Sequence, residues 1–151
     1  MDVHNNWRRA FVGTMADISA AAQWAETVTA DQELPDELVF ALQLCLEELM
    51  CNIVRHGGTG HWDSGGDPPL VLAAPLNVEI DIAIDSHCVS LTVEDDGKPF
   101  DVVNAPAHAI DRPLDEVEPG GLGVQLIKKF ASKLTYQQAG LGNRVVVEFL
   151  R

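Results

Sequence analysis

The sequence predicts an α/β (α+β) two-layer sandwich in which the helices lie on one face of a mixed sheet. Three observations predict this class. Apolar residues recur at helical spacing in the first third of the chain and alternate with polar residues in the middle third. In the last third, a helix that begins at a pair of glycines is followed by two strands. The order is therefore strand, two helices, two strands, a loop, a helix and two strands.

The first third opens with a short strand predicted over residues 6–13. From Thr14 the apolar residues recur every three or four positions, which is typical of a helix, and Thr14 or Asp17 is the expected N-cap. A break follows, in which Pro35 suits the first turn of a second helix over about 36–55. Its apolar stripe consists of Leu38, Leu42, Cys45, Leu49 and Ile53.

The middle third begins with residues 57–76, which are rich in Gly, Pro and Asp and read as a surface loop. Strict alternation then predicts strands over 78–84 and 89–93, joined by a turn near Ser86 into an antiparallel hairpin. The segment 102–119 has no clear period and contains three prolines, so we expect a mobile connection there.

The last third starts with glycines at 120, 121 and 123, which open a helix predicted over about 122–133. Two final strands are expected at 134–139 and 144–150, and the glycine-containing segment 140–143 supplies the turn between them.

The bulk composition indicates one globular domain over residues 1–151, with 46% hydrophobic and 22% charged residues. The 23 acidic and 10 basic residues give a formal net charge of −13, which disfavours nucleic acid and anionic membrane surfaces as partners. An anionic ligand would then need a metal ion, backbone N–H groups and a few local cations. Three cysteines, no signal-like N-terminus and no long apolar run make a reducing cytoplasm the default expectation.

A polar line runs along the second predicted helix through Glu48, Asn52 and His56, which are spaced by four residues and share a face. The line borders the apolar stripe, where a carboxylate can act as a general base and an amide oxygen is a hard ligand suited to Mg²⁺. Glu47 is rotated away from Asn52, so Glu48 is the favoured acid. An ordinary solvated helix face remains the alternative explanation.

Two further motifs each have a plain structural alternative. Asp95 ends an apolar strand, where its carboxylate can accept a hydrogen bond from an exocyclic amine, and Gly97 lets a flat ring approach the backbone. The alternative is a common Asp-Gly turn. Gly121 and Gly123 at a helix start can expose backbone N–H groups to an anion, or can simply satisfy a loop that needs positive φ.

The order and spacing of the three motifs resemble those of the GHKL superfamily of Bergerat-fold ATPases, over nearly the whole chain. Within it the motifs are most similar to those of the stand-alone RsbW-type anti-sigma-factor serine kinases. The matching residues are Glu48, Asn52 and His56, then Asp95, Gly97, Phe100 and Asp101, then Gly121, Leu122 and Gly123.

The resemblance implies a role for each motif. Glu48 would be the general base, Asn52 would hold Mg²⁺ between the phosphates of ATP, and Asp95 would bind the adenine amine. The other residues implied in nucleotide binding are His56, Gly97, Phe100, Gly121, Leu122 and Gly123. The segment 102–119 would be a lid over ATP, with Arg112 as a contact to phosphate or partner.

The resemblance also implies partners. Members of the subfamily phosphorylate a serine of a STAS-domain antagonist, sequester a sigma factor and are homodimers. Two departures stand out: the loop 57–76 is longer than usual, and Gly142-Asn143-Arg144 replaces a frequent Gly-Thr pair. Arg144 is therefore either a phosphate contact or only structural.

Rival readings remain. Sensor histidine kinases need an acceptor histidine, which the helix over 15–30 lacks, and gyrase-like and chaperone relatives need large further domains. A nucleotide-gated binding protein without kinase activity is the main alternative. A metal site is the third, but Cys51 and His56 have poor helical geometry for one shared ion. Its other candidate ligands are His61 and Asp63.

Overall fold

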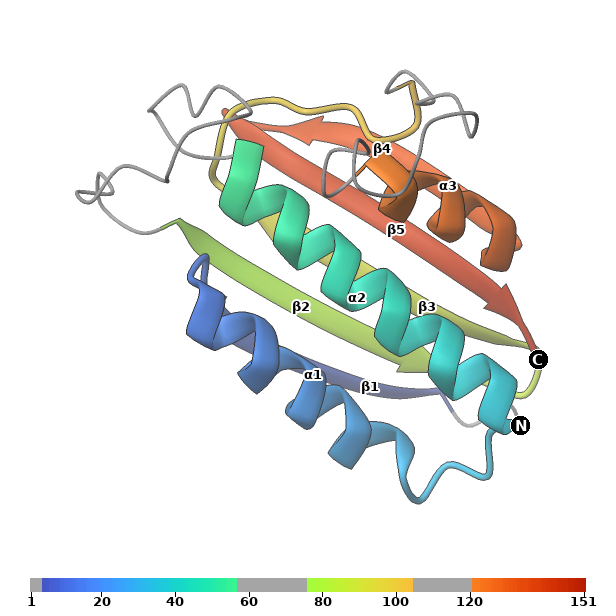
Figure 1. Ribbon diagram of the computed structural model, residues 1–151. Coiled ribbons are helices and arrows are strands. Elements are labelled where there is room, and N and C mark those ends of the chain that lie inside the picture. Colours follow the sequence, from blue (N-terminus) through green and yellow to red (C-terminus); the bar gives the residue numbers. More distant parts are fainter. Residues whose placement is uncertain (1–3, 57–75, 105–120) are drawn as a thin grey trace.

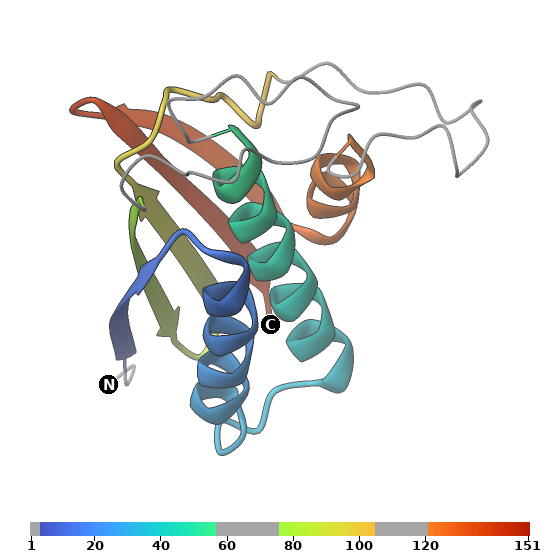
Figure 2. The ribbon, with the colours of Figure 1, turned by 60° about the vertical axis from the view of Figure 1, so that its left-hand side comes forward.

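The computed structural model describes residues 4–56, 76–104 and 121–151. In this part of the chain, five strands form one sheet, and three helices cover one of its faces (Figures 1 and 2). The two-layer sandwich predicted from the sequence is confirmed. The elements are β1 (Asn5–Val12), α1 (Met15–Thr29), α2 (Asp36–His56), β2 (Asn77–Ile84), β3 (Cys88–Asp95), α3 (Gly121–Phe130), β4 (Lys133–Ala139) and β5 (Gly142–Leu150).

The sheet order is β1-β2-β3-β5-β4, and every pairing among these strands is antiparallel. The expectation of a mixed sheet was therefore wrong. The reason lies in the last crossover: β4 runs in the same direction as β3, but β5 lies between them and is antiparallel to both. A parallel pair would form if β4 lay beside β3.

The core lies between the sheet and α2, which crosses the centre of the helical layer (Figure 1). The predicted apolar stripe of α2 is buried along its whole length, and alternate residues of β2 and β3 face it. The fully buried side chains include Leu42, Leu46, Met50, Ile80, Ile82, Leu91 and Val147. This packing fixes the face on which each remaining side chain of α2 lies.

The element boundaries follow local signals with one exception. Thr14 caps α1 by accepting a hydrogen bond from the backbone N–H of Asp17 at 3.2 Å, and α2 starts directly after Pro35. The third helix ends at Phe130, three residues earlier than predicted. The backbone N–H of Ser132 instead donates to the carbonyl of Glu148 on β5 at 2.8 Å, which draws the chain into the sheet.

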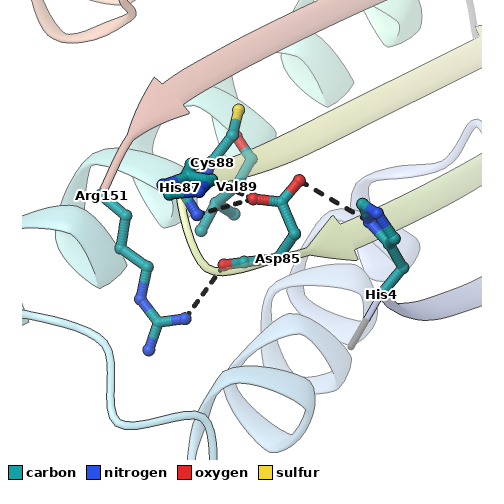
Figure 3. Close-up of polar contacts among 6 residues, drawn as sticks. All are labelled: His4, Asp85, His87, Cys88, Val89 and Arg151. Carbon is teal, nitrogen blue, oxygen red and sulfur yellow. Dashed lines mark hydrogen bonds and ion pairs between the residues drawn. The ribbon is translucent and has the colours of Figure 1, made fainter. Parts of the chain in front are cut away.

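Both described ends of the chain meet at the turn between β2 and β3 (Figure 3). Asp85 accepts hydrogen bonds from the backbone N–H groups of His87 and Cys88 at 2.7 Å, and its carboxylate lies 3.7 Å from His4. The guanidinium of Arg151 donates to the carbonyl of Asp85 at 3.0 Å. This end of the hairpin is therefore closed by hydrogen bonds and by the contact between His4 and Asp85.

No helix within the described ranges is long and apolar enough to cross a membrane. The predicted loop 57–76, apart from Leu76, and the connection from 105 onward lie outside the described residues, so the expectations about them stay predictions. The assignment of residues 1–151 to a single ATP-binding domain also stays a prediction.

Candidate functional site

The site lies at the other end of the hairpin, where the last turns of α2 pass over the ends of β3 and β5. A pocket that is partly open to solvent is found there. It is lined by Leu49, Asn52, Ile53, Val93, Asp95, Lys98, Phe100, Val102, Asn143 and Val145. The mixture of apolar walls and a few polar groups suits a flat heteroaromatic ligand.

Helix α2 brings Glu48 and Asn52 to this end because they lie one turn apart at the edge of its buried stripe. Asn52 is only 4% exposed, and its Nδ2 has no hydrogen-bond partner among the described residues. A buried amide with spare hydrogen-bonding capacity costs free energy unless another group satisfies it. Asn52 is therefore a candidate ligand-binding residue.

Glu48 is half-buried, and burial raises the pKa of its carboxyl, with a smaller contribution from the neighbouring charge of Glu47 and an opposing one from Arg55. Its side chain lies against Gly123 in the first turn of α3. A Cβ atom added to Gly123 would overlap the Glu48 carboxylate. Two predicted motifs that are 75 residues apart therefore meet here, and the glycine makes room for the acid.

Asp95 lies at the end of β3 and lines the pocket. Its Oδ1 accepts hydrogen bonds from the backbone N–H of Gly97 at 2.9 Å and from the Asn143 side-chain amide at 3.0 Å. Burial raises the pKa of the Asp95 carboxyl, while those two hydrogen bonds oppose the rise. Both of these hydrogen bonds use Oδ1, and within the described part of the chain Oδ2 accepts none, so Oδ2 is the oxygen able to accept from a ligand.

Asn143 is the main residue that sequence reasoning did not identify as a site residue. It is 4% exposed, lies on β5 and lines the pocket. The replacement of the usual Gly-Thr pair is the signal for this position, but the sequence predicted a phosphate contact only for the adjacent, charged Arg144. The β-strand alternation decides between them, because neighbouring residues of β5 lie on opposite faces of the sheet.

Arg144 lies on the face of the sheet that the helices leave uncovered. Its Nε forms an ion pair with Glu94 of β3 at 3.2 Å. The structure therefore does not place Arg144 with the pocket residues. Of the two predicted roles, it supports the structural one.

Gly142 is a second residue without a predicted role beyond the turn. A Cβ atom there would overlap the backbone carbonyl oxygen of Asp95, and the nearby backbone of Asp96 leaves no room either. Only glycine therefore lets β5 approach the end of β3 this closely. The turn itself is shorter than predicted, since β5 already begins at Gly142, and Gly140 takes a positive φ of 59°.

Phe100, which the resemblance implies in nucleotide binding, also lines the pocket, and its backbone N–H donates to the Asn143 side chain at 2.7 Å. Asp101 accepts hydrogen bonds from the backbone N–H groups of Val103 and Asn104, which forms a turn after the pocket wall. Gly97 is buried beside Asp95. The residues of the second motif are thus held together around the end of β3.

Several predicted site residues cannot be placed against the pocket. Gly121 is the first residue of α3, but the side chain of Leu122, like that of His56 at the end of α2, lies outside the described part. Arg112 and most of the predicted lid also lie outside it. So do His61 and Asp63 of the rival metal site, and the described residues contain no group of three or more His, Cys, Asp or Glu side chains suited to a metal ion.

The chain is similar to known proteins over most of its length. Residues 11–149 match the family model of the histidine kinase-like ATPase domain. The chain is 29% identical over 126 residues to the serine/threonine-protein kinase BtrW of Bordetella bronchiseptica, which covers 83% of this chain and 80% of BtrW.

Among solved structures, the fold is similar to that of the histidine kinase domain of a blue-light activated histidine kinase from Erythrobacter litoralis. The TM-score is 0.50 at 19% identity, over 89% of this chain and 59% of that one. The chain thus spans less than two thirds of that structure. The chain belongs to the family of histidine kinase-like ATPase domains, within the GHKL superfamily that its three motifs resemble.

Proposed function

We propose that this chain is an ATP-dependent protein serine/threonine kinase. It transfers the γ-phosphoryl group of ATP to a serine of a STAS-domain antagonist protein. The observation that carries the proposal is the position of Glu48, a half-buried carboxylate that lies against Gly123 and one helical turn from the pocket residue Asn52. The similarity to a serine/threonine-protein kinase supports the same reaction.

The chemistry follows from these residues. The serine hydroxyl oxygen forms a bond to the γ-phosphorus, the bond from that phosphorus to the bridging β–γ oxygen breaks, and ADP leaves. The hydroxyl proton passes to the Glu48 carboxylate, and its raised pKa makes this carboxylate a better proton acceptor than an ordinary glutamate. Asp95 and the apolar walls hold the purine, which fixes the nucleotide in position for transfer.

Asn52 suits the magnesium ion that such a reaction requires, because an amide oxygen is a hard ligand of the kind that Mg²⁺ prefers and the residue is buried at the pocket. The amide oxygen would bind the ion. Bound Mg²⁺ would supply neutralisation of the phosphate charge in a protein whose net charge is −13.

The partners belong to the same proposal. A phosphate adds about −1.5 to −2 charge to the antagonist, and the acidic surface of this chain favours release of that product. The chain, as a homodimer, would then hold a sigma factor while the antagonist is phosphorylated. The phosphorylation state of the antagonist thereby sets which partner is bound.

The test is transfer of label from γ-labelled ATP to a STAS-domain protein that binds the chain. Glu48→Gln should lower the transfer rate by about 100-fold or more while ATP affinity changes little. Glu47→Gln is the matched control, because Glu47 is exposed on the same helix; loss of its minor contribution to the pKa of Glu48 should leave the rate close to that of the wild type.

The rate should also depend on pH. The base must be deprotonated, so transfer should fall as the pH drops through the raised pKa of Glu48, above the value of about 4.3 for an ordinary glutamate. ATP binding without any transfer by the wild type would contradict the kinase and indicate a nucleotide-gated binding protein instead.

A further inference from the structure

We propose that Asn143 is a positioning residue that fixes the hydrogen-bonding state of Asp95, and thereby makes the pocket select a purine with an amine at position 6. This inference rests on the proposed function in that it takes the pocket as the nucleotide site. It adds a residue outside the three motifs and a stated basis for base selectivity.

The first step is that the orientation of the Asn143 amide is determined by backbone groups. Its Nδ2 donates to the carbonyl of Lys98 at 2.7 Å, and its Oδ1 accepts from the backbone N–H of Phe100 at 2.7 Å. A carbonyl can only accept and an N–H can only donate, so a flipped amide would lose both bonds. The amide therefore has one permitted orientation.

The second step follows from that orientation. The remaining N–H of Nδ2 must point to Asp95, where it donates to Oδ1 at 3.0 Å beside the N–H of Gly97. The Tyr136 hydroxyl donates to Oδ1 of Asn143 at 2.6 Å and completes its set of four hydrogen bonds. With Oδ1 of Asp95 occupied by two donors, a proton is disfavoured on this oxygen and the charge is stabilised.

The third step concerns the ligand. An Asp95 carboxylate that is held ionised presents Oδ2 as an acceptor only, which suits the amine of adenine. A purine with a carbonyl at position 6 would place two acceptors against each other. Because burial already raises the pKa of Asp95, loss of the Asn143 donor should increase its protonated fraction and weaken the discrimination.

A merely structural role for Asn143 makes a different prediction. Asn143 also holds the backbone of Lys98 and Phe100, so its loss would disturb the pocket wall. Such a disturbance would weaken all purine nucleotides alike. The ratio of affinities for ATP and inosine triphosphate, which differ at position 6, separates the two roles.

The experiment measures the dissociation constants of ATP and inosine triphosphate, with magnesium, by titration calorimetry on the full chain. The wild type should prefer ATP by about 100-fold or more. Asn143→Asp keeps the shape and the acceptor but replaces the donor by a second carboxylate. We expect it to reduce the preference by about tenfold or more.

In that variant, ATP affinity should also change between pH 6 and pH 8 by more than in the wild type, because two adjacent carboxylates share a proton. Asn143→Ala removes the donor without adding charge and should lower the preference in the same direction. Tyr136→Phe is the matched control: it deletes the hydroxyl that bonds Asn143 and the backbone of Phe100 but leaves the hydrogen bond between Asn143 and Asp95 in place, and should change the preference by less than about twofold.

Thermal melting without nucleotide first establishes that each variant is folded. The inference is overturned if both Asn143 variants weaken the two nucleotides equally, or if Tyr136→Phe alters the preference as much as they do. Absence of ATP binding by the wild type would instead refute the proposed function. Wild-type binding without phosphotransfer would leave this inference standing.

Discussion

Asp85 and Asp95 lie at opposite ends of the β2–β3 hairpin and have opposite environments. Asp85 is partly exposed at the turn, and hydrogen bonds from the backbone of His87 and Cys88 lower the pKa of its carboxyl. Asp95 is at the pocket, and burial raises the pKa of its carboxyl. The first carboxylate stabilises the fold when ionised, whereas the second is ionised at a cost.

The same contrast extends to the neighbouring residues. At the turn, His4 and Arg151 both contact Asp85 (Figure 3). At the pocket, Asn52 has an unpaired buried Nδ2 within the described chain, and Glu48 also has a raised pKa. Buried polar groups left with spare capacity are typical of a site prepared for a ligand. The difference indicates which end of the hairpin serves folding and which serves binding.

The largest effect on ligand binding is expected for Asp95→Asn, at the pocket end of the hairpin. We expect ATP affinity to fall by about 100-fold or more, because the amide can turn its NH₂ toward the amine of adenine. Thermal stability at pH 7 should stay equal or rise, since a buried charge is removed while an acceptor remains for Gly97 and Asn143.

The upward shift of the pKa of Asp95 also predicts how stability depends on pH. A raised folded-state pKa means that the folded protein holds the proton more tightly, so this group's contribution to stability declines as pH rises from about 3.9 toward the raised value. The variant should lack that decline. Melting of Asp95→Asn well below the wild type at pH 7 would show that this carboxylate serves the fold after all.

Two glycine substitutions at the pocket end should separate an effect on catalysis from an effect on stability. Gly123→Ala meets only the movable end of the Glu48 side chain, so it should displace the carboxylate and lower the phosphotransfer rate by up to about 100-fold with little loss of stability. Gly142→Ala meets the backbone of Asp95 and should cost about 1–3 kcal/mol of unfolding free energy. Transfer assays and denaturant unfolding measure the two effects, and an equal loss of stability in both variants would contradict the distinction.

The smallest effect is expected at the turn. Asp85→Ala removes the acceptor for two backbone N–H groups, so the melting midpoint should fall by a few degrees while ATP affinity is unchanged. The pKa of Asp85 is lowered in the folded state, so the stability that the wild type has over the variant should be fully present above the ordinary aspartate pKa of about 3.9. This difference in stability should disappear as pH falls through the lowered pKa. A difference that persists in stronger acid would rule out this cause.

Much of the fold was predictable because its signals are local. The four-residue spacing on α2 and the alternation of β2 and β3 each depend on a few neighbouring residues, and both predictions are confirmed. The prediction of a mixed sheet was wrong because strand order is a non-local property. Nothing near Lys133 or Gly142 in the sequence indicates that β5, rather than β4, lies beside β3.

The candidate site divides in the same way. Asp95 and Gly97 are neighbours in the sequence, so their motif was recognisable and they do lie together. Asn143 joins them only through the pairing of β5 with β3, across 48 residues of chain. Two of its four hydrogen-bond partners are backbone groups, which have no side-chain signature that a sequence motif could reveal.

The sequence by itself determined the two-layer architecture, the family and the three motifs, since periodic apolar residues and spaced polar ones are properties of short segments. Only the tertiary structure decided that Glu48 lies against Gly123, that Asn143 holds Asp95, and that Arg144 lies on the opposite face. The physical reason is that strand pairing and helix packing bring distant segments within hydrogen-bonding distance. A shift of one residue in that pairing would turn Asn143 away from the pocket and Arg144 toward it.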